Sequence, residues 1–293
     1  MLWRSRKKTL AFLLPAVLTL LVIGLGPLLF AVNMSLRRYH LARPAGGNPW
    51  VGLDNFATVL NDPSFWDSML RTGSFMAVVL PAQVLLGLFV ALLLHRPGFG
   101  LMRTLTRVAL VIPLATTPAV VGLIGRLVFN REAGIVNYGL SLVGVPSITW
   151  LGDPSSAFIA IIAMELWQWT PFVALVFLAG LTTVPTEVED AAKLETNRFI
   201  DVLRYIQIPY LLPGLTAVLI LRTADILKLF DMVFTMTRGG PGSATELVSL
   251  YIQRIGFRVF DQGVASAQAI ILLIITIILA RLYIRIFYRE VSA

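Results

Sequence analysis

The chain has 293 residues, of which 57% are hydrophobic and only 14% charged, and its mean hydropathy is +0.81. A water-soluble protein of this composition would have too little polar surface to present to water, so soluble enzyme and binding domains are excluded. The formal net charge of +8 comes mainly from basic residues at the ends of apolar runs, which indicates membrane anchoring and no nucleic-acid partner. The chain contains no cysteine, which excludes disulfides, thiolate metal sites and a cysteine nucleophile.

The first apolar run follows a basic N-terminus that contains Arg4, Arg6, Lys7 and Lys8. This run exceeds about 20 residues, which is longer than the apolar core of a cleaved signal peptide. We therefore expect an uncleaved first span whose basic end lies in the cytoplasm.

Five further apolar runs are long enough to cross a hydrocarbon layer of about 30 Å as helices. The fold class predicted is an all-α polytopic membrane protein with about six transmembrane helices in a single domain over residues 1–293. The predicted spans are Leu10–Val32, Gly73–Leu94, Leu105–Phe129, Ala157–Leu181, Leu211–Phe234 and Val264–Ile286.

The distribution of basic residues predicts the orientation of these spans. An even number of spans places both termini on one side, and both termini are basic. The short connection between the second and third spans carries Arg96, Arg103 and Arg107. We therefore expect cytoplasmic termini, and residues 182–209 become the longest cytoplasmic connection.

Polar and aromatic residues within the second and fourth spans are candidates for contact with a transported solute. The fourth span brings together Glu165, Trp167, Gln168 and Trp169, and the second contains Gln83. Flat aromatic faces pack against sugar rings, and amide or carboxylate groups bind hydroxyls. The alternative is an aromatic belt at the membrane interface together with ordinary core packing.

The connection between the fourth and fifth spans is predicted to contain two short helices outside the membrane. Thr186 and Glu189 have the spacing of a capping box, and the acidic first turn complements the helix dipole. Ala191 and Ala192 leave one face open for close approach, and Asn197 is expected to end the first helix.

The second of these helices carries an apolar stripe, and Pro209 is expected to interrupt it before the fifth span. The stripe consists of Phe199, Val202, Leu203 and Ile206. Taken by themselves, these residues fit either an amphipathic hairpin that lies on the membrane or a helix–turn–helix surface with a function of its own.

The fifth predicted span carries charges of alternating sign at intervals of three residues, namely Arg222, Asp225, Lys228 and Asp231. Each charge at the membrane centre costs about 2.5–3.5 kcal/mol on insertion scales. They therefore either pair along the helix as a self-neutralising ladder or line a hydrated solute pathway.

The 182–209 connection resembles the cytoplasmic loop of importer-type ATP-binding-cassette permeases. That family's pattern is Glu-Ala-Ala, three residues, Gly, nine residues and Ile-x-Leu-Pro, and this chain matches its spacing from Asp190-Ala191-Ala192 to Ile206-Gln207-Ile208-Pro209. The residue types differ at Asp190, Thr196 and Ile208. In the family this loop forms a coupling helix that sits in a cleft of the ATPase subunit. The resemblance assigns ATPase coupling to Glu189, Asp190, Ala191, Ala192, Glu195, Thr196 and Asn197.

The resemblance extends over nearly the whole chain and is to the carbohydrate-uptake type, the family of maltose, trehalose and glycerol-phosphate importers. The matching fragments are "VGLDNF" at 51–56, "ELWQWTPFVALVFLAGLTTVP" at 165–185 and "LRTADILKLFDMVFTMTRGGPGSATE" at 221–246. The last fragment is similar to a stretch that marks one of the two permeases in heteromeric sugar importers.

The resemblance implies a permease subunit in the cytoplasmic membrane of a bacterium or archaeon. Its implied partners are a second, non-identical permease, two ATPase subunits, an extracytoplasmic solute-binding protein and the lipid bilayer. The chain has no Gly-rich phosphate loop followed by Lys-Ser/Thr, no catalytic triad and no metal-ligand cluster. We therefore expect no catalysis and no bound cofactor or metal here, with ATP and Mg²⁺ on the ATPase.

The solute stays open among disaccharides, polyols, sugar phosphates and sulfonated sugars. The alternative function is a stand-alone secondary transporter that uses the charged fifth span as an ion or proton site. Such a carrier would have no use for a coupling helix.

Overall fold

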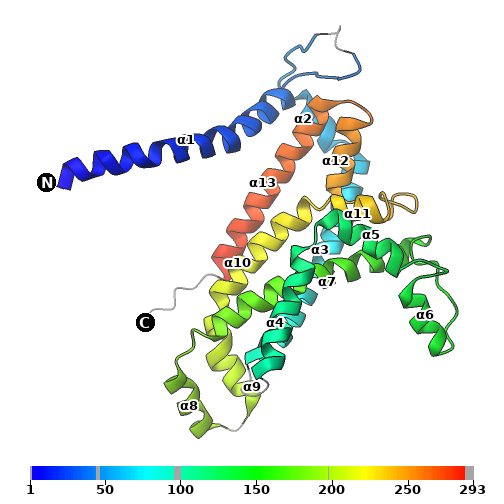
Figure 1. The fold of residues 1–293 in the computed structure, drawn as a ribbon. Coiled ribbons are helices and arrows are strands. Elements are labelled where there is room, and N and C mark those ends of the chain that lie inside the picture. The colour runs from blue at the N-terminus through cyan, green and yellow to red at the C-terminus, as the bar shows by residue number, and fades with distance from the viewer. Residues whose placement is uncertain (1, 44–46, 96–99, 197, 288–293) are drawn as a thin grey trace. The chain divides into compact units, whose positions relative to one another are not determined.

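The computed structural model describes residues 2–43, 47–95, 100–196 and 198–287, and helices dominate it (Figure 1). Within these ranges, extended pairing is limited to two isolated bridges, Arg37–Trp50 and His40–Asp261. The chain divides into two compact units. One comprises residues 1–65 and 252–274, and the other comprises residues 66–251 and 275–293.

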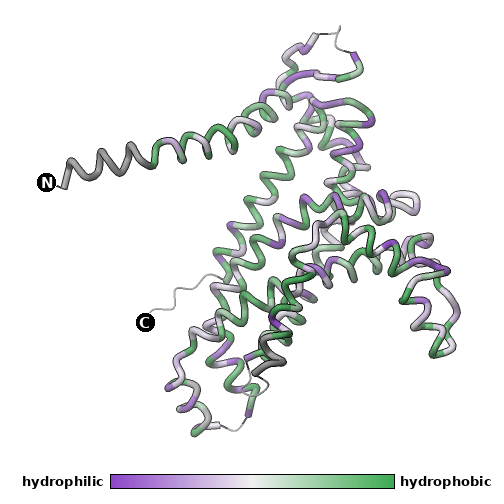
Figure 2. Tube along the Cα trace, viewed as in Figure 1, coloured by the Kyte–Doolittle hydropathy of each residue, from purple (hydrophilic) through white to green (hydrophobic). Residues whose placement is uncertain are grey.

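Five described helices are long and apolar enough to cross a membrane, or up to six when one bent pair is counted as a single span. This confirms the predicted all-α polytopic class, and Figure 2 shows the long helices coloured predominantly hydrophobic. The helices are α1 (Leu2–Ser35), α2 (Asp54–Leu60), α3 (Pro63–His95), α4 (Gly100–Ala115), α5 (Pro118–Val128), α6 (Ile135–Leu142), α7 (Pro154–Leu181), α8 (Thr186–Glu195), α9 (Phe199–Val202), a π-helical turn (Leu203–Gln207), α10 (Ile208–Leu227), α11 (Asp231–Met236), α12 (Val248–Phe257) and α13 (Gln262–Phe287).

In the first unit, hydrogen bonds connect the segment that follows α1 to α2 and to the start of α13. The buried Asn55 amide donates to the carbonyls of Ser35 and Arg37, both at 2.8 Å. The backbone N–H of Gln262 donates to the Tyr39 carbonyl at 3.0 Å. These bonds satisfy backbone groups that a turn between helices would otherwise leave unpaired.

The second unit is built around α7, which packs against α4, α5 and α10. Ile161 and Met164 on α7 belong to an apolar cluster with Phe75 of α3 and Met232 of α11. The helix α5 approaches α11 closely at Gly122, where an added Cβ would lie 2.6 Å from the Met232 carbonyl oxygen. Small residues permit such close helix contacts in membrane proteins.

The third span is not the single helix predicted over Leu105–Phe129. It consists of α4 and α5, which are bent by 100° at a short break. Pro118 begins α5, and Thr117 before it is extended, with φ −67° and ψ 145°. A residue that precedes proline is driven out of the helical region, so the sequence itself encodes this break.

The fifth span also differs from the prediction of Leu211–Phe234. The candidate span runs from Phe199 to Leu227, so the predicted second helix of the cytoplasmic loop is continuous with it through the π-turn. Pro209 does not interrupt the helix, because the carbonyl it would clash with belongs to Tyr205 in the π-turn, where the hydrogen-bond pattern is already shifted.

Candidate functional site

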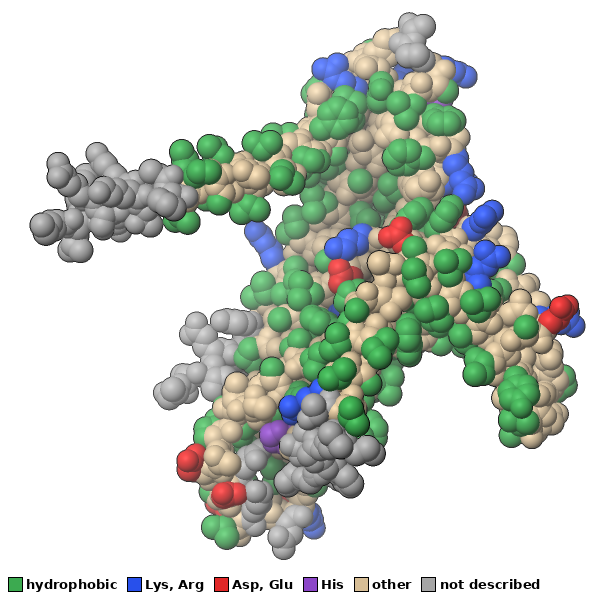
Figure 3. Space-filling model, in the orientation of Figure 1, with side chains coloured by type: hydrophobic (Ala, Val, Ile, Leu, Met, Phe, Trp, Pro, Cys, Tyr) green, Lys and Arg blue, Asp and Glu red, His purple; other side chains and the backbone are tan. Residues whose placement is uncertain are grey.

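A polar pocket of about 240 Å³ lies in the second unit where α5, α7, α10 and α11 meet. It contrasts with the apolar surface of the helices, on which charged side chains are few (Figure 3). Its lining residues are Pro118, Glu165, Trp169, Arg222, Asp225, Lys228, Leu229, Phe230 and Asp231. Six of these nine are polar, charged or indole side chains that the sequence had singled out within the fourth and fifth spans.

Arg222 contacts most of the other polar groups of the site and is fully buried, with a relative exposure of 0%. Its Nη2 pairs with Glu165, which is also buried, and its Nη1 donates to Asp225 at 3.0 Å. Its Nε donates to Gln83 Oε1 at 3.3 Å. The guanidinium also lies 4.2 Å from the centre of the Trp169 ring, within the range of a cation–π contact.

Helix geometry explains why these residues meet. Glu165 and Trp169 are four residues apart on α7, and Arg222 and Asp225 are three apart on α10, so each pair shares one helix face. Gln83 connects α3 to α7, because its Nε2 donates to the Glu165 carbonyl at 3.2 Å. The buried arginine therefore ties α3, α7 and α10 together.

The rim of the pocket is more exposed and carries charges of both signs. Lys228 caps the C-terminus of α10 and pairs with Asp225 at 3.0 Å, although its side chain is 73% exposed. Asp231 begins α11 and is exposed. The expected one-helix ladder therefore holds from Arg222 to Lys228 only, since α10 ends before Asp231.

Two other candidates from the fourth span lie away from the pocket lining. Gln168 is buried and donates from Nε2 to the Thr116 carbonyl at 2.9 Å, which satisfies a backbone group at the break in the third span. Trp167 is 42% exposed and points elsewhere on α7. The sequence did not indicate Phe230, whose ring lines the pocket and stacks on Phe234 with centroids 5.1 Å apart.

The Glu165 carboxylate has one oxygen, Oε2, that is not occupied by the ion pair with Arg222. Within the described part of the chain, Glu165 Oε2 is buried and accepts no hydrogen bond. Buried polar atoms are nearly always satisfied, so this oxygen is available to a donor from outside the chain. The described residues hold no cluster of ligands for a metal ion.

The segment between the fourth and fifth spans contains the separate polar helix α8, which Figure 2 shows mostly in hydrophilic colours. Thr186 was predicted to cap this helix, but it is the first helical residue, and the cap position belongs to Pro185, which makes no side-chain hydrogen bond. Proline has a fixed φ near that of the extended cap conformation, so the helix begins one residue earlier than expected. Among the predicted coupling residues, Asn197 and the side chain of Glu189 lie outside the described residues.

Burial divides the remaining coupling residues. Ala191, Asp190 and Glu195 are exposed, whereas Ala192 is only 7% exposed within this chain. Thr196, at the position of the family's glycine, is extended with φ −146° and ψ 139°. Any residue adopts this conformation, so threonine needs no left-handed turn here, and its Oγ1 bonds Asp201 at 3.1 Å.

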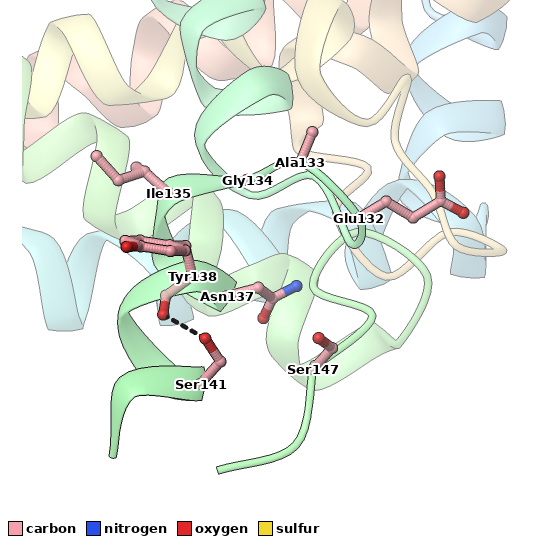
Figure 4. Close-up of a pocket in the computed structure, with 8 residues that line it drawn as sticks. All are labelled: Glu132, Ala133, Gly134, Ile135, Asn137, Tyr138, Ser141 and Ser147. Carbon is pink, nitrogen blue, oxygen red and sulfur yellow. Dashed lines mark hydrogen bonds between the residues drawn. The ribbon is translucent and has the colours of Figure 1, made fainter. Parts of the chain in front are cut away.

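A second pocket of about 470 Å³ lies beside α6 in the connection between the third and fourth spans (Figure 4). Asn137 organises this connection, because its buried amide bonds the backbone of Arg131 and Ile148 and the Trp150 indole. Figure 4 shows Ser141 bonded to the Tyr138 carbonyl, whereas the Glu132 side chain points away from the helix.

Comparison with known proteins matches residues 56–293 to the family model described as binding-protein-dependent transport system inner membrane component. The trehalose/maltose transport system permease protein MalF of Thermococcus litoralis is 34% identical over 97% of this chain and 95% of its own length. The sulfoquinovosyl glycerol transport system permease protein SmoG of Agrobacterium fabrum is 32% identical over 96% of this chain and 91% of its own.

A solved structure shares the fold. A chain of a bacterial alginate ABC transporter, crystallised in complex with an alginate pentasaccharide-bound periplasmic protein, superposes with a TM-score of 0.82 at 19% identity. The match covers 97% of this chain and 96% of that one.

Proposed function

Since the chain belongs to the family of binding-protein-dependent transport system inner membrane components, we propose that it is the permease subunit through which an ATP-driven importer moves a carbohydrate across the cytoplasmic membrane. The observation that carries this proposal is the polar pocket, whose main residues stand on α7 and α10. These are the two spans that the α8–α9 segment connects. Two relatives with sugar-related names support the carbohydrate class.

The pocket supplies the chemistry that carbohydrate binding needs. Trp169 and Phe230 offer aromatic faces, the half-buried Asp225 offers a carboxylate, and Lys228 and Asp231 offer exposed hydrogen-bonding groups. Its volume of about 240 Å³ lies below the roughly 300–1,000 Å³ of complete small-molecule sites. A second, non-identical permease would supply the other wall of the solute pathway.

The chain path connects the pocket to the coupling segment. Glu165 lies 16 residues before the end of α7 at Leu181, which is about 24 Å along a helix. Arg222 lies at a similar distance from the π-turn. A movement of α8 caused by an ATPase subunit would therefore act on both helices that carry the pocket residues. In this way ATP hydrolysis would open the pocket alternately to the two sides of the membrane.

The remaining parts of the proposal concern the assembly. Two ATPase subunits would bind ATP and Mg²⁺ and hydrolyse the nucleotide, so that this chain itself catalyses nothing. Ala191, Asp190, Glu195 and Thr196 would face the ATPase, with both termini on the same cytoplasmic side. A solute-binding protein would deliver the carbohydrate at the opposite side.

The test is reconstitution of the chain with its candidate partner permease, ATPase and solute-binding protein in lipid vesicles. We expect uptake of a radiolabelled sugar that requires all components and internal ATP. Uptake driven by an ion gradient in vesicles that contain this chain alone would refute the proposal and identify a secondary carrier. A stable homodimer that transports would refute the non-identical partner alone.

A further inference from the structure

We propose that the polar pocket selects an uncharged, hydroxyl-rich solute and disfavours anionic sugars such as phosphorylated, sulfonated or uronic ones. This inference rests on the proposed function and narrows it. Its basis is that each nitrogen of the buried cation of the pocket already donates to the protein, while a carboxylate oxygen beside it has no hydrogen-bond partner among the described residues.

The arginine that would be the natural anchor for an anion is already bound to protein groups and buried. Each of the three nitrogens of the Arg222 guanidinium donates to a protein group, on Gln83, Asp225 and Glu165. One face of the guanidinium lies over the Trp169 ring, and the residue has 0% exposure. An incoming phosphate, sulfonate or carboxylate would have to displace a buried carboxylate before it could bind in the forked manner that arginine favours.

The charges of the described lining residues do not favour an anion either. Three carboxylates (Glu165, Asp225 and Asp231) stand against two cations (Arg222 and Lys228), which leaves a formal charge of −1. If Glu165 were protonated, the formal charge of the lining residues would be zero, which still does not attract an anion. Lys228, the more exposed cation, is already paired with Asp225 at 3.0 Å. Like charges brought together in a poorly hydrated site oppose binding.

The unsatisfied carboxylate oxygen favours a ligand that donates a hydrogen bond. Glu165 Oε2 is buried beside the pocket and lacks a partner among the described residues. A sugar hydroxyl donates the bond that this oxygen lacks, whereas a deprotonated acid group has no proton to donate there. The apolar ring faces of an uncharged sugar match Trp169 and Phe230.

The experiment uses the membrane complex of both permeases and the ATPase in lipid nanodiscs, so that the solute-binding protein imposes no selection of its own. Binding is measured by equilibrium dialysis at low salt with two matched pairs of radiolabelled probes. One pair is trehalose and trehalose 6-phosphate, and the other is maltose and maltobionate. We expect each uncharged sugar to bind about tenfold or more tightly than its anionic counterpart.

Equal or tighter binding of the anionic probes would overturn the inference while leaving the carbohydrate permease intact. If neither member of either pair binds, the inference fails together with the assignment of this pocket to the solute pathway. The proposed function itself is tested separately. It is refuted if the complete reconstituted importer shows no ATP-dependent sugar uptake.

Charge variants of the pocket provide a second measurement. Asp231→Asn removes one exposed carboxylate and should lower the preference for trehalose over trehalose 6-phosphate roughly fivefold at low salt. The matched control is Asp67→Asn, which removes an exposed carboxylate of α3 that does not line the pocket. An equal shift in both variants would show that the preference reflects the net charge of the protein and would overturn the role of the pocket.

Discussion

The ion pair between Glu165 and Arg222 makes a quantitative prediction about stability. Both side chains are buried, with exposures of 1% and 0%. Removing one partner leaves the other charge uncompensated, and such changes typically cost about 3–5 kcal/mol. In Glu165→Leu the arginine keeps Asp225 and Gln83, so we expect the free energy of unfolding to fall by about 3 kcal/mol. In Arg222→Met the buried carboxylate loses its only cation among the described residues, so we expect about 4–5 kcal/mol.

The double variant Glu165→Leu/Arg222→Met should be much more stable than either single variant. Replacing a whole buried ion pair by apolar side chains of similar size is often neutral or stabilising. Here the Gln83 amide oxygen loses a partner, which costs about 1 kcal/mol. The expected coupling free energy between the two positions is therefore on the order of 5 kcal/mol or more.

The assay is unfolding of the purified complex in mixed micelles, followed through tryptophan fluorescence across a series of denaturing-detergent concentrations. Lys228→Met is the matched control, because its ion pair with Asp225 is exposed and should contribute less than about 1 kcal/mol. Additive losses in the double variant, or single variants as stable as the parent, would refute a buried pair that ties α7 to α10.

Three further outcomes are expected elsewhere in the chain. Ala191→Trp, on the exposed face of α8, should leave membrane insertion intact but lower ATPase co-purification about five- to a hundredfold, because overpacking a close contact costs about 1–3 kcal/mol; unchanged retention and uptake would exclude this surface from coupling. Gly122→Leu should lower the thermal stability of the complex markedly, since its Cβ would lie 2.6 Å from the Met232 carbonyl oxygen, and wild-type melting behaviour would contradict the close contact of α5 with α11. Asn137→Ala should cost about 1–3 kcal/mol locally and expose the connection around α6 to added protease, whereas an unchanged cleavage rate would show that this amide is dispensable.

The sequence predicted which segments are apolar spans better than it predicted where their helices break or end. Hydropathy and length identify apolar helices, because each span must bury its backbone polar groups internally. The break at Thr117–Pro118 was readable in principle from the proline, but an apolar window averages across it. The end of α10 at Leu227 was missed for a similar reason, since the segment beyond it remains apolar enough to continue a span.

The sequence singled out six of the residues that line the pocket, but not the contacts between them. Glu165 and Arg222 are 57 positions apart, so no local periodicity could indicate that they pair. Spacing along the sequence indicates only pairs within one helix, and it therefore predicted a ladder of ion pairs from Arg222 to Asp231. Long-range packing decided which of the two tryptophans, Trp167 or Trp169, lies against the arginine.

The π-helical turn at Leu203–Gln207 has a rotational consequence for the helix that follows it. A π-helical hydrogen bond spans one more residue than an α-helical one, and each residue of an α-helix turns the chain by about 100° and advances it about 1.5 Å. If this turn relaxed to α-helical geometry, the face of α10 that carries Arg222 and Asp225 would rotate by about that angle relative to the chain at Phe199. A local change in hydrogen-bond register between α9 and α10 would then change the direction in which Arg222 points, about 22 Å along the helix from the π-turn.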